Sequence, residues 1–123
     1  MKALVLDDSR AMRALIGGML REAGFEVSQA GSADEAMGLL RAEGAADVAL
    51  VDWNLPGVDG LEFVRRMRAD ISFARTRILM VTTEVGQDRV EAALREGVQE
   101  YLMKPFTKEM LLGKLALIGD GKI

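Results

Sequence analysis

Five short apolar runs recur along the chain, and each is followed by a longer segment whose apolar residues have helical spacing. Runs such as Val48–Val51 are apolar at consecutive positions and not only at alternate ones. That pattern is typical of strands buried on both faces, as in a parallel sheet that helices cover on each side. The predicted strands are Ala3–Leu6, Phe25–Gln29, Val48–Val51, Ile78–Val81 and Tyr101–Met103.

The segments between the runs carry signals that begin and end helices. Ser32 and Asp59 are each followed three residues later by glutamate, which makes a capping box, and Gly24 and Gly97 follow two of the helical segments. Gly17–Gly18 lies inside the first segment, where each glycine weakens a helix by about 1 kcal/mol, and the sequence offers no reason for it. The predicted helices span residues 9–23, 32–43, 59–68, 87–96 and 107–118.

Strands that alternate with helices along 123 residues predict one α/β domain over residues 1–123. Right-handed crossovers and this length favour a doubly wound, five-stranded parallel sheet in the flavodoxin-like order 2-1-3-4-5, the middle layer of an αβα sandwich. In such sheets the functional site lies at the carboxyl ends of the strands, where the winding reverses between strands 1 and 3.

The residue types that are absent limit the chemistry. The chain has no cysteine and no histidine, which removes disulfides, thiolate and imidazole ligands, and the most common general base. Any metal should therefore be a hard cation bound by oxygen. The net charge of −3 and the lack of a basic stripe argue against nucleic-acid binding. No apolar run is long enough for a signal peptide or a membrane span, so we expect a cytoplasmic protein without membrane insertion.

Polar residues follow the predicted strands at the edge where the site is expected. Asp7 and Asp8 follow strand 1, and Asp52 follows strand 3. Thr82 follows strand 4, and Lys104 follows strand 5. Because the carboxyl ends of parallel strands share one edge, this topology brings three carboxylates, a hydroxyl and an ammonium into one crevice.

Three neighbouring carboxylates repel one another, so the cluster is costly unless a cation neutralises it. Without histidine or cysteine, Mg²⁺ is the expected cofactor, since it takes one or two carboxylates, several waters and a phosphate oxygen. We expect Asp8 and Asp52 as direct ligands and Asp7 as the partner of a metal-bound water. The backbone carbonyl of Asn54 is expected as a further ligand.

Asp52 is the candidate nucleophile toward phosphorus. A carboxylate is ionised at neutral pH and needs no general base. Phosphoryl transfer requires mainly positioning and charge neutralisation, which Mg²⁺ and Lys104 would provide. The product would be an aspartyl phosphate, a reactive mixed anhydride whose transience suits a signal.

Each of these residues also has a purely structural interpretation. Asp7 or Asp8 could cap the first helix, and Asp52 could cap the turn after strand 3. Lys104 could be an ordinary ion-pair partner. Asp59 begins a capping box, so we interpret it as a helix cap and leave it out of the site.

Four stretches lie in order at the predicted strand ends: Asp7–Asp8, Asp52–Gly60, Val81–Glu84 and Tyr101–Thr107. Together they resemble the receiver domain of response regulators in bacterial two-component systems, in its single-domain, CheY-like form, and the resemblance covers essentially the whole chain. It implies that Asp52 is the phosphoacceptor and that Asp7 and Asp8 are the acidic metal pair. Thr82 would hydrogen-bond the phosphoryl group, and Lys104 would pair with it.

The resemblance also implies roles around the site. Tyr101 matches an aromatic switch that moves from outside to inside when the threonine of the site is drawn towards the phosphoryl group. Asn54 and Glu84 match positions that tune the hydrolysis of the aspartyl phosphate. Lys114 matches a position on the output surface. The Lys104–Pro105 peptide bond is expected to be cis.

Such a protein would not be a conventional enzyme, since it catalyses only its own phosphorylation and dephosphorylation. The resemblance implies a sensor histidine kinase as the phosphodonor. The phosphohistidine must belong to that partner, because this chain has no histidine. Only five residues follow residue 118, too few for an output domain, so the output would be protein contact through the surface of helix 4, strand 5 and helix 5. The resemblance implies that the target would be a flagellar motor switch protein in chemotaxis. It also implies a phosphatase as a further partner and a monomeric chain.

Other functions remain open. Stand-alone receivers also serve phosphorelays outside chemotaxis. A flavodoxin-like electron carrier shares the strand order, but Asp7 and Asp8 would repel a flavin phosphate after strand 1. A haloacid-dehalogenase-like phosphatase also forms an aspartyl phosphate, but it needs an Asp-x-Asp pair and a cap domain for which there is no room. A degenerate receiver acting as an adaptor would not fill every motif position.

Overall fold

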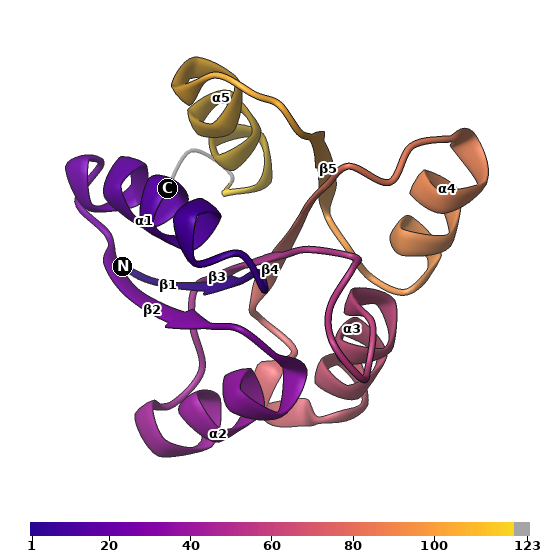
Figure 1. The fold of residues 1–123 in the computed structure, drawn as a ribbon. Coiled ribbons are helices and arrows are strands. Elements are labelled where there is room, and N and C mark those ends of the chain that lie inside the picture. Colours follow the sequence, from indigo (N-terminus) through magenta and orange to yellow (C-terminus); the bar gives the residue numbers. More distant parts are fainter. Residues whose placement is uncertain (120–123) are drawn as a thin grey trace.

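The computed structural model describes residues 1–119 as a layered α/β structure (Figure 1). Its elements are β1 (Lys2–Leu6), α1 (Arg10–Glu22), β2 (Glu26–Ala30), α2 (Ala33–Glu43), β3 (Val48–Val51), α3 (Gly60–Ala69), the 3₁₀ helix η1 (Ile71–Phe73), β4 (Arg77–Thr82), α4 (Gln87–Arg95), β5 (Glu100–Met103) and α5 (Lys108–Ile118). The prediction that no output domain follows rests partly on residues 120–123, which lie outside the described residues.

The strands form one parallel sheet in the order β2-β1-β3-β4-β5, which confirms the predicted fold class and strand order. β1 lies between β2 and β3, so the winding direction reverses there. The register pairs Leu6 with Val51, and the amide of Asp52 donates to the carbonyl of Leu6 at 2.9 Å. β1 and β3 therefore end side by side, and their next residues, Asp7 and Asp52, leave the sheet together.

Helices cover both faces of the sheet, as the apolar strands predict (Figure 1). Leu4 and Leu6 of β1 belong to the core packed under α2, α3 and α4, whereas Ala3 and Val5 belong to the core under α1 and α5. All four side chains are at most 2% exposed. Burying a leucine or valine side chain stabilises a fold by roughly 1.5–3 kcal/mol. The two cores thus hold the sheet, and its polar residues are left at the strand ends.

Some element boundaries differ from those predicted. β2 begins at Glu26 and not at Phe25, because the Phe25 amide donates to the carbonyl of Leu20 and closes the end of α1. β4 extends to Thr82, whose carbonyl accepts a hydrogen bond from the Lys104 amide at 3.0 Å. The 3₁₀ helix η1 was not predicted.

α1 is capped by Ser9, whose hydroxyl accepts from the Met12 amide at 3.1 Å. The interpretation of Asp7 or Asp8 as the cap of this helix is therefore wrong. The Asp7 carboxylate instead accepts from the Ser9 amide at 2.9 Å and shapes the turn between β1 and α1. The predicted caps of the other helices are confirmed at Ser32, Asp59 and Thr107.

One of the two glycines inside α1 has a packing reason. Gly17 is buried beside β2, where a Cβ would lie 2.8 Å from Nε2 of Gln29 and would displace the end of this flexible side chain. Gly18 has no such neighbour within 4 Å, and nothing in the structure explains it.

Arg68 of α3 joins loops at the amino-terminal edge of the sheet. Its guanidinium donates to the carbonyls of Thr76 at 2.8 Å, Gly97 at 2.9 Å and Phe73 at 3.1 Å. These acceptors are uncharged, and burial, followed by the nearby charge of Arg77, lowers the pKa of Arg68. The side chain thus ties α3 to the segment before β4 and to the α4–β5 turn.

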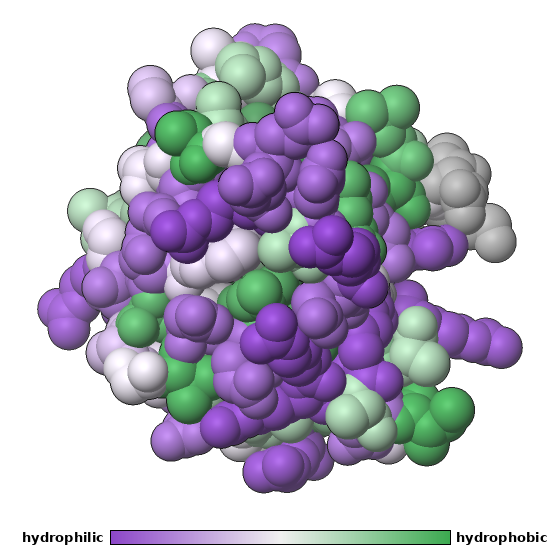
Figure 2. Space-filling model, turned by 90° about the vertical axis from the view of Figure 1, so that its right-hand side faces the viewer, coloured by the Kyte–Doolittle hydropathy of each residue, from purple (hydrophilic) through white to green (hydrophobic). Residues whose placement is uncertain are grey.

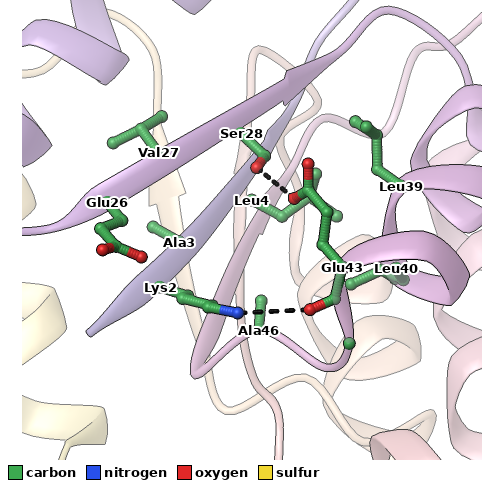
Figure 3. A pocket seen from close by; sticks show the side chains of 11 residues that line it. Lys2, Ala3, Leu4, Glu26, Val27, Ser28, Leu39, Leu40, Glu43 and Ala46 are labelled. Carbon is green, nitrogen blue, oxygen red and sulfur yellow. Dashed lines mark hydrogen bonds between the residues drawn. The ribbon is translucent and has the colours of Figure 1, made fainter.

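A cavity of about 280 Å³ lies at the amino ends of β1 and β2, beside α2 (Figure 3). Two hydrogen bonds join polar groups of its lining, since the Glu43 carboxylate accepts from the Ser28 hydroxyl at 2.6 Å and the Glu43 carbonyl accepts from the Lys2 ammonium at 3.2 Å. This cavity is at the opposite edge of the sheet from the polar strand ends. Within residues 1–119, no helix is both long and apolar enough to cross a membrane.

Candidate functional site

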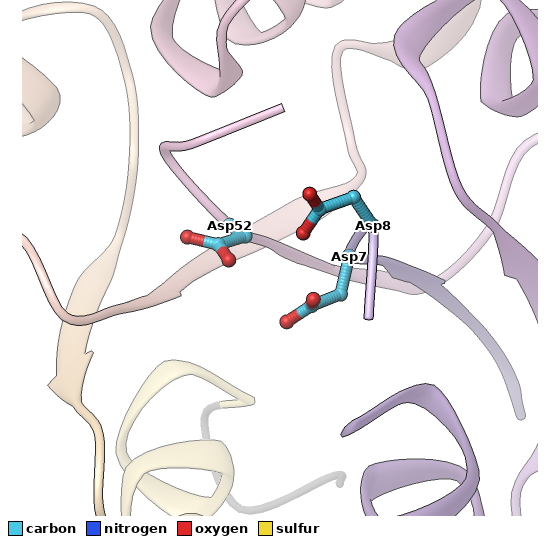
Figure 4. Close-up of side chains that lie close together, drawn as sticks. All are labelled: Asp7, Asp8 and Asp52. Carbon is cyan, nitrogen blue, oxygen red and sulfur yellow. The ribbon is translucent and has the colours of Figure 1, made fainter. Parts of the chain in front are cut away.

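Three carboxylates meet at the carboxyl edge of the sheet (Figure 4). Asp7 and Asp8 follow β1 and Asp52 follows β3, and one oxygen of each lies within 4.8 Å of the others. Asp7 and Asp52 are buried, whereas Asp8 is exposed. The structure thus brings together the three aspartates that the strand order predicts to meet.

Lys104 follows β5 and reaches into this cluster. Its ammonium lies 2.6 Å from Oδ2 of Asp7 and 2.9 Å from Oδ2 of Asp52, and its side chain is only 12% exposed. Burial by itself lowers the pKa of Lys104, but the hydrogen bonds and charges of Asp7 and Asp52 outweigh it, so the pKa is raised. The ammonium is therefore charged at neutral pH and bridges the two buried carboxylates.

The donor set fits a hard divalent cation. Three carboxylates against one ammonium leave two negative charges at a largely buried site, and all the ligand atoms of the aspartates are oxygens. The exposed Asp8 leaves one side of the cluster open to metal-bound water. The backbone N–H of Asn54 donates to Oδ1 of Asp52 at 3.2 Å, which places the Asn54 backbone beside the cluster.

Thr82 and Tyr101 lie on β4 and β5, which are neighbours in the sheet. Thr82 ends β4, is fully buried, and accepts from the Glu84 amide through its hydroxyl at 3.2 Å. Tyr101 lies in the inward orientation, and its hydroxyl donates to the carbonyl of Glu84 at 2.9 Å. Burial first, and then the charge of Glu84, raises the pKa of Tyr101, so the phenol remains a donor. Glu84 thus connects the threonine and the tyrosine through its backbone.

The Glu84 side chain connects to the loop after β3. One of its oxygens accepts from Nδ2 of Asn54 at 3.1 Å, and the other lies 3.1 Å from a guanidinium nitrogen of Arg89 on α4. The Arg89 guanidinium also lies over the ring of Trp53, 5.1 Å from its centroid. These residues line an open pocket of about 500 Å³, together with Asp8, Leu55, Pro56 and Asp59.

The other predicted residues lie as follows. Asp59 caps α3, as interpreted, although it also lines the pocket. Lys114 of α5 forms an ion pair of 3.1 Å with Glu100 of β5, and both side chains are partly exposed. The Lys104–Pro105 bond is cis.

Sequence reasoning missed three residues that shape the site. Gly60 begins α3, and a Cβ there would overlap the carbonyl oxygen of Asp52. A glycine directly after a helix cap is the one signal that marks it, since glycine is a poor helix former. Arg13 donates to the carbonyl of Asp7 at 2.6 Å, and Arg89 contacts Trp53. No sequence pattern indicates these two contacts. The first depends on how the turn between β1 and α1 folds, and the second joins residues 36 positions apart.

The family model of the response regulator receiver domain matches residues 3–116. The chain belongs to this family. A receiver domain is a signalling phosphoacceptor and not a conventional enzyme, and membership implies a histidine kinase as partner. Membership also sets aside the flavodoxin-like carrier and the haloacid-dehalogenase-like phosphatase.

Relatives of this receiver domain match nearly the full length of this chain. The chemotaxis protein CheY1 of Helicobacter pylori is 42% identical over 119 residues, which are 96% of both chains. The structure of chemotaxis protein CheY4 of Vibrio cholerae gives a TM-score of 0.89 at 34% identity, covering 95% of this chain and 97% of that one. A response regulator of Burkholderia pseudomallei, solved with a phosphorylated aspartic acid, a calcium ion and citrate, gives 0.84 at 28% identity, covering 93% of this chain and 65% of that one.

Proposed function

We propose that Asp52 accepts a phosphoryl group from the phosphohistidine of a sensor kinase in a Mg²⁺-dependent reaction, and that the phosphorylated chain signals by binding a target protein in chemotaxis. The observation that carries this proposal is the buried bridge of Lys104 between Asp7 and Asp52, at the edge where a third carboxylate, Asp8, stays exposed.

The transfer needs no general base from this chain. A carboxylate oxygen of Asp52 forms the new bond to phosphorus while the phosphorus–nitrogen bond of the donor breaks, and the imidazole nitrogen leaves with the bonding pair. The Lys104 ammonium and the backbone N–H of Asn54 each donate to one oxygen of the Asp52 carboxylate, so Asp52 is positioned before the phosphodonor arrives.

Asp8 and Asp52 would hold the metal directly, with Asp7 on a bound water and the Asn54 carbonyl as a further ligand. A bound Mg²⁺ supplies positive charge against the phosphoryl oxygens and orients them. The phosphorylated Burkholderia relative was solved with a calcium ion, which supports a divalent cation in this kind of site.

The phosphoryl group would recruit two further side chains. The Thr82 hydroxyl, now paired with the Glu84 amide, would turn to a phosphoryl oxygen, and Lys104 would pair with another. Because Tyr101 is bonded to the carbonyl of the same Glu84, a shift of this loop acts directly on the tyrosine. Asn54 and Glu84, bonded to each other beside Asp52, would set how readily water attacks the aspartyl phosphate.

The output surface would be formed by α4, β5 and α5. The face that includes α4 is largely hydrophilic with hydrophobic side chains exposed among polar ones (Figure 2). Val85, Leu94 and Met103 are each about half exposed or more, which suits a protein contact. The chemotaxis proteins among the relatives support a flagellar motor switch protein as target, contacted near Tyr101 and Lys114. We further propose that the protein is a cytoplasmic monomer and that a phosphatase resets it.

Labelling with acetyl phosphate and Mg²⁺, followed by intact mass measurement, tests the chemistry. We expect one phosphate on the wild type and none on Asp52→Asn. Undiminished labelling of the variant would sink the acceptor assignment. Binding to the motor switch protein that is tighter after labelling would support chemotaxis, whereas equal binding would favour a phosphorelay outside it.

A further inference from the structure

Arg89 is fixed at the mouth of the acidic pocket by two contacts. Its guanidinium lies 3.1 Å from an oxygen of Glu84 and 5.1 Å from the ring centroid of Trp53. Trp53 directly follows Asp52 and is only 7% exposed, so it is a rigid support for the guanidinium. A residue of α4 is thereby held against the loop that carries the acceptor.

The charges around this pocket are unbalanced. Its lining includes the carboxylates of Asp8, Asp59 and Glu84, and Arg89 is the cation among its described lining residues. The ammonium of Lys104 is already bonded to Asp7 and Asp52 and does not line the pocket. An anionic phosphodonor that enters from this side therefore passes three carboxylates and one guanidinium.

A cationic ligand and an anionic ligand respond in opposite ways to the charge of the Arg89 guanidinium. Removing the guanidinium makes the local charge more negative, which favours a divalent cation and disfavours a phosphate dianion. A residue with only a structural role would, when changed, loosen the pocket and weaken the binding of both.

We propose that Arg89 is a specificity-determining residue: its positive charge strengthens the binding of anionic phosphodonors in the pocket and weakens the binding of the metal ion. This inference rests on the proposed function of Asp52. The Arg89 side chain is 46% exposed and that of Glu84 is 28% exposed. Solvent screening therefore keeps the effect to about two- to five-fold in each direction.

The variant Arg89→Gln distinguishes the effect of the charge on Mg²⁺ from its effect on the phosphodonor. Mg²⁺ binding, measured by calorimetry at low ionic strength, should tighten by about two- to five-fold, while the acetyl phosphate concentration that gives half the maximal labelling rate rises by a similar factor. Both differences should shrink in 0.5 M salt, where the Debye length falls to about 4 Å. Arg89→Lys keeps the charge and should stay close to wild type in both measurements.

Arg66→Gln is the matched control. Arg66 lies on α3 with a side chain 42% exposed, pairs with Glu62 and Asp34, and does not line the pocket. Its change alters the net charge by the same amount, so it reports the effect of overall charge alone.

Opposite shifts in Arg89→Gln that Arg66→Gln lacks would support the proposal. Equal behaviour of the two variants, or a change of the same sign for Mg²⁺ and acetyl phosphate, would overturn it. A wild type that binds Mg²⁺ but takes no label would instead contradict the proposed function, and the Mg²⁺ affinities would still report the charge of Arg89.

Discussion

The ammonium of Lys104 lies 2.6 Å from a carboxylate oxygen of Asp7, a residue 97 positions earlier in the chain. The same ammonium lies 2.9 Å from Asp52. One side chain from the end of the last strand thereby holds together the carboxylates that follow β1 and β3. The contact neutralises part of the acidic cluster and also fixes the orientation of the acceptor.

Replacing Lys104 by methionine should destabilise the protein when Mg²⁺ is absent. Asp7 and Asp52 would remain buried beside each other without their counter-charge, which we expect to lower the free energy of unfolding by about 2–4 kcal/mol. Saturating Mg²⁺ should restore part of the loss, since it supplies positive charge to the same carboxylates. Urea denaturation with and without Mg²⁺ measures both effects.

Lys108→Met serves as the control for this change. Lys108 pairs with Glu22 on the exposed surface between α5 and α1, so its loss should change stability little, with no dependence on Mg²⁺. A Lys104→Met protein as stable as this control would contradict the bridging role.

Tyr101 should titrate above its ordinary pKa of 10.0, because burial and then the charge of Glu84 favour the neutral phenol. It is the only tyrosine in the chain, so the ultraviolet absorbance of phenolate reports this side chain alone. The folded state holds the phenolic proton more tightly than the unfolded chain does. The contribution of Tyr101 to stability is therefore fully present below about pH 10 and is lost as the pH rises through the raised pKa.

Comparison with Tyr101→Phe isolates this effect from that of Lys104, whose pKa is raised as well. The wild type should lose stability more steeply than Tyr101→Phe above pH 10. An absorbance midpoint at or below 10.0 in the folded protein would contradict the buried, hydrogen-bonded position of the tyrosine.

Much of the fold and the site followed from local pattern and elementary topology. Runs such as Val48–Val51 predict strands covered on both faces, and parallel strands must place Asp7 and Asp52 at one edge. The helix cap at Ser9 could not be predicted, because three successive residues, Asp7, Asp8 and Ser9, are all capping types. The contact of Arg89 with Trp53 also gave no signal, since packing between α4 and the acceptor loop alone determines it.

Gly60→Ala should displace the backbone of the acceptor Asp52 and slow its phosphorylation. The added Cβ would overlap the carbonyl oxygen of Asp52 and lie 2.9 Å from Cα of Trp53, so α3 or the acceptor loop must shift. We expect a loss of about 2–3 kcal/mol in unfolding free energy and labelling slower by roughly tenfold or more. Denaturation and acetyl phosphate labelling measure the two effects.

Gly18→Ala provides the contrast, because the position on α1 has open space and lies inside a helix. Alanine there should raise stability by up to about 1 kcal/mol and leave labelling unchanged. If Gly60→Ala labelled at the wild-type rate, the acceptor backbone would not depend on this close approach.

Arg68→Met should loosen the amino-terminal edge of the sheet. Without the guanidinium, the carbonyls of Thr76 and Gly97 lose a shared donor, and buried acceptors without partners cost about 1–3 kcal/mol each when water cannot reach them. Because the site is half-buried, we expect a loss of about 2 kcal/mol in unfolding free energy. Lysine lacks the wide planar fork of donors with which arginine reaches both loops, so Arg68→Lys should recover only part of the loss.

Arg66→Met, two residues earlier on the exposed side of α3, should stay close to wild type in the same denaturation experiment. Hydrogen exchange separates the mechanisms, since loss of the Arg68 contacts should speed exchange first in the Gly97–Gln99 turn that leads into β5. If Arg68→Met matched Arg66→Met in stability and in exchange at this turn, water would be replacing the guanidinium, and the loops would be held by the backbone alone.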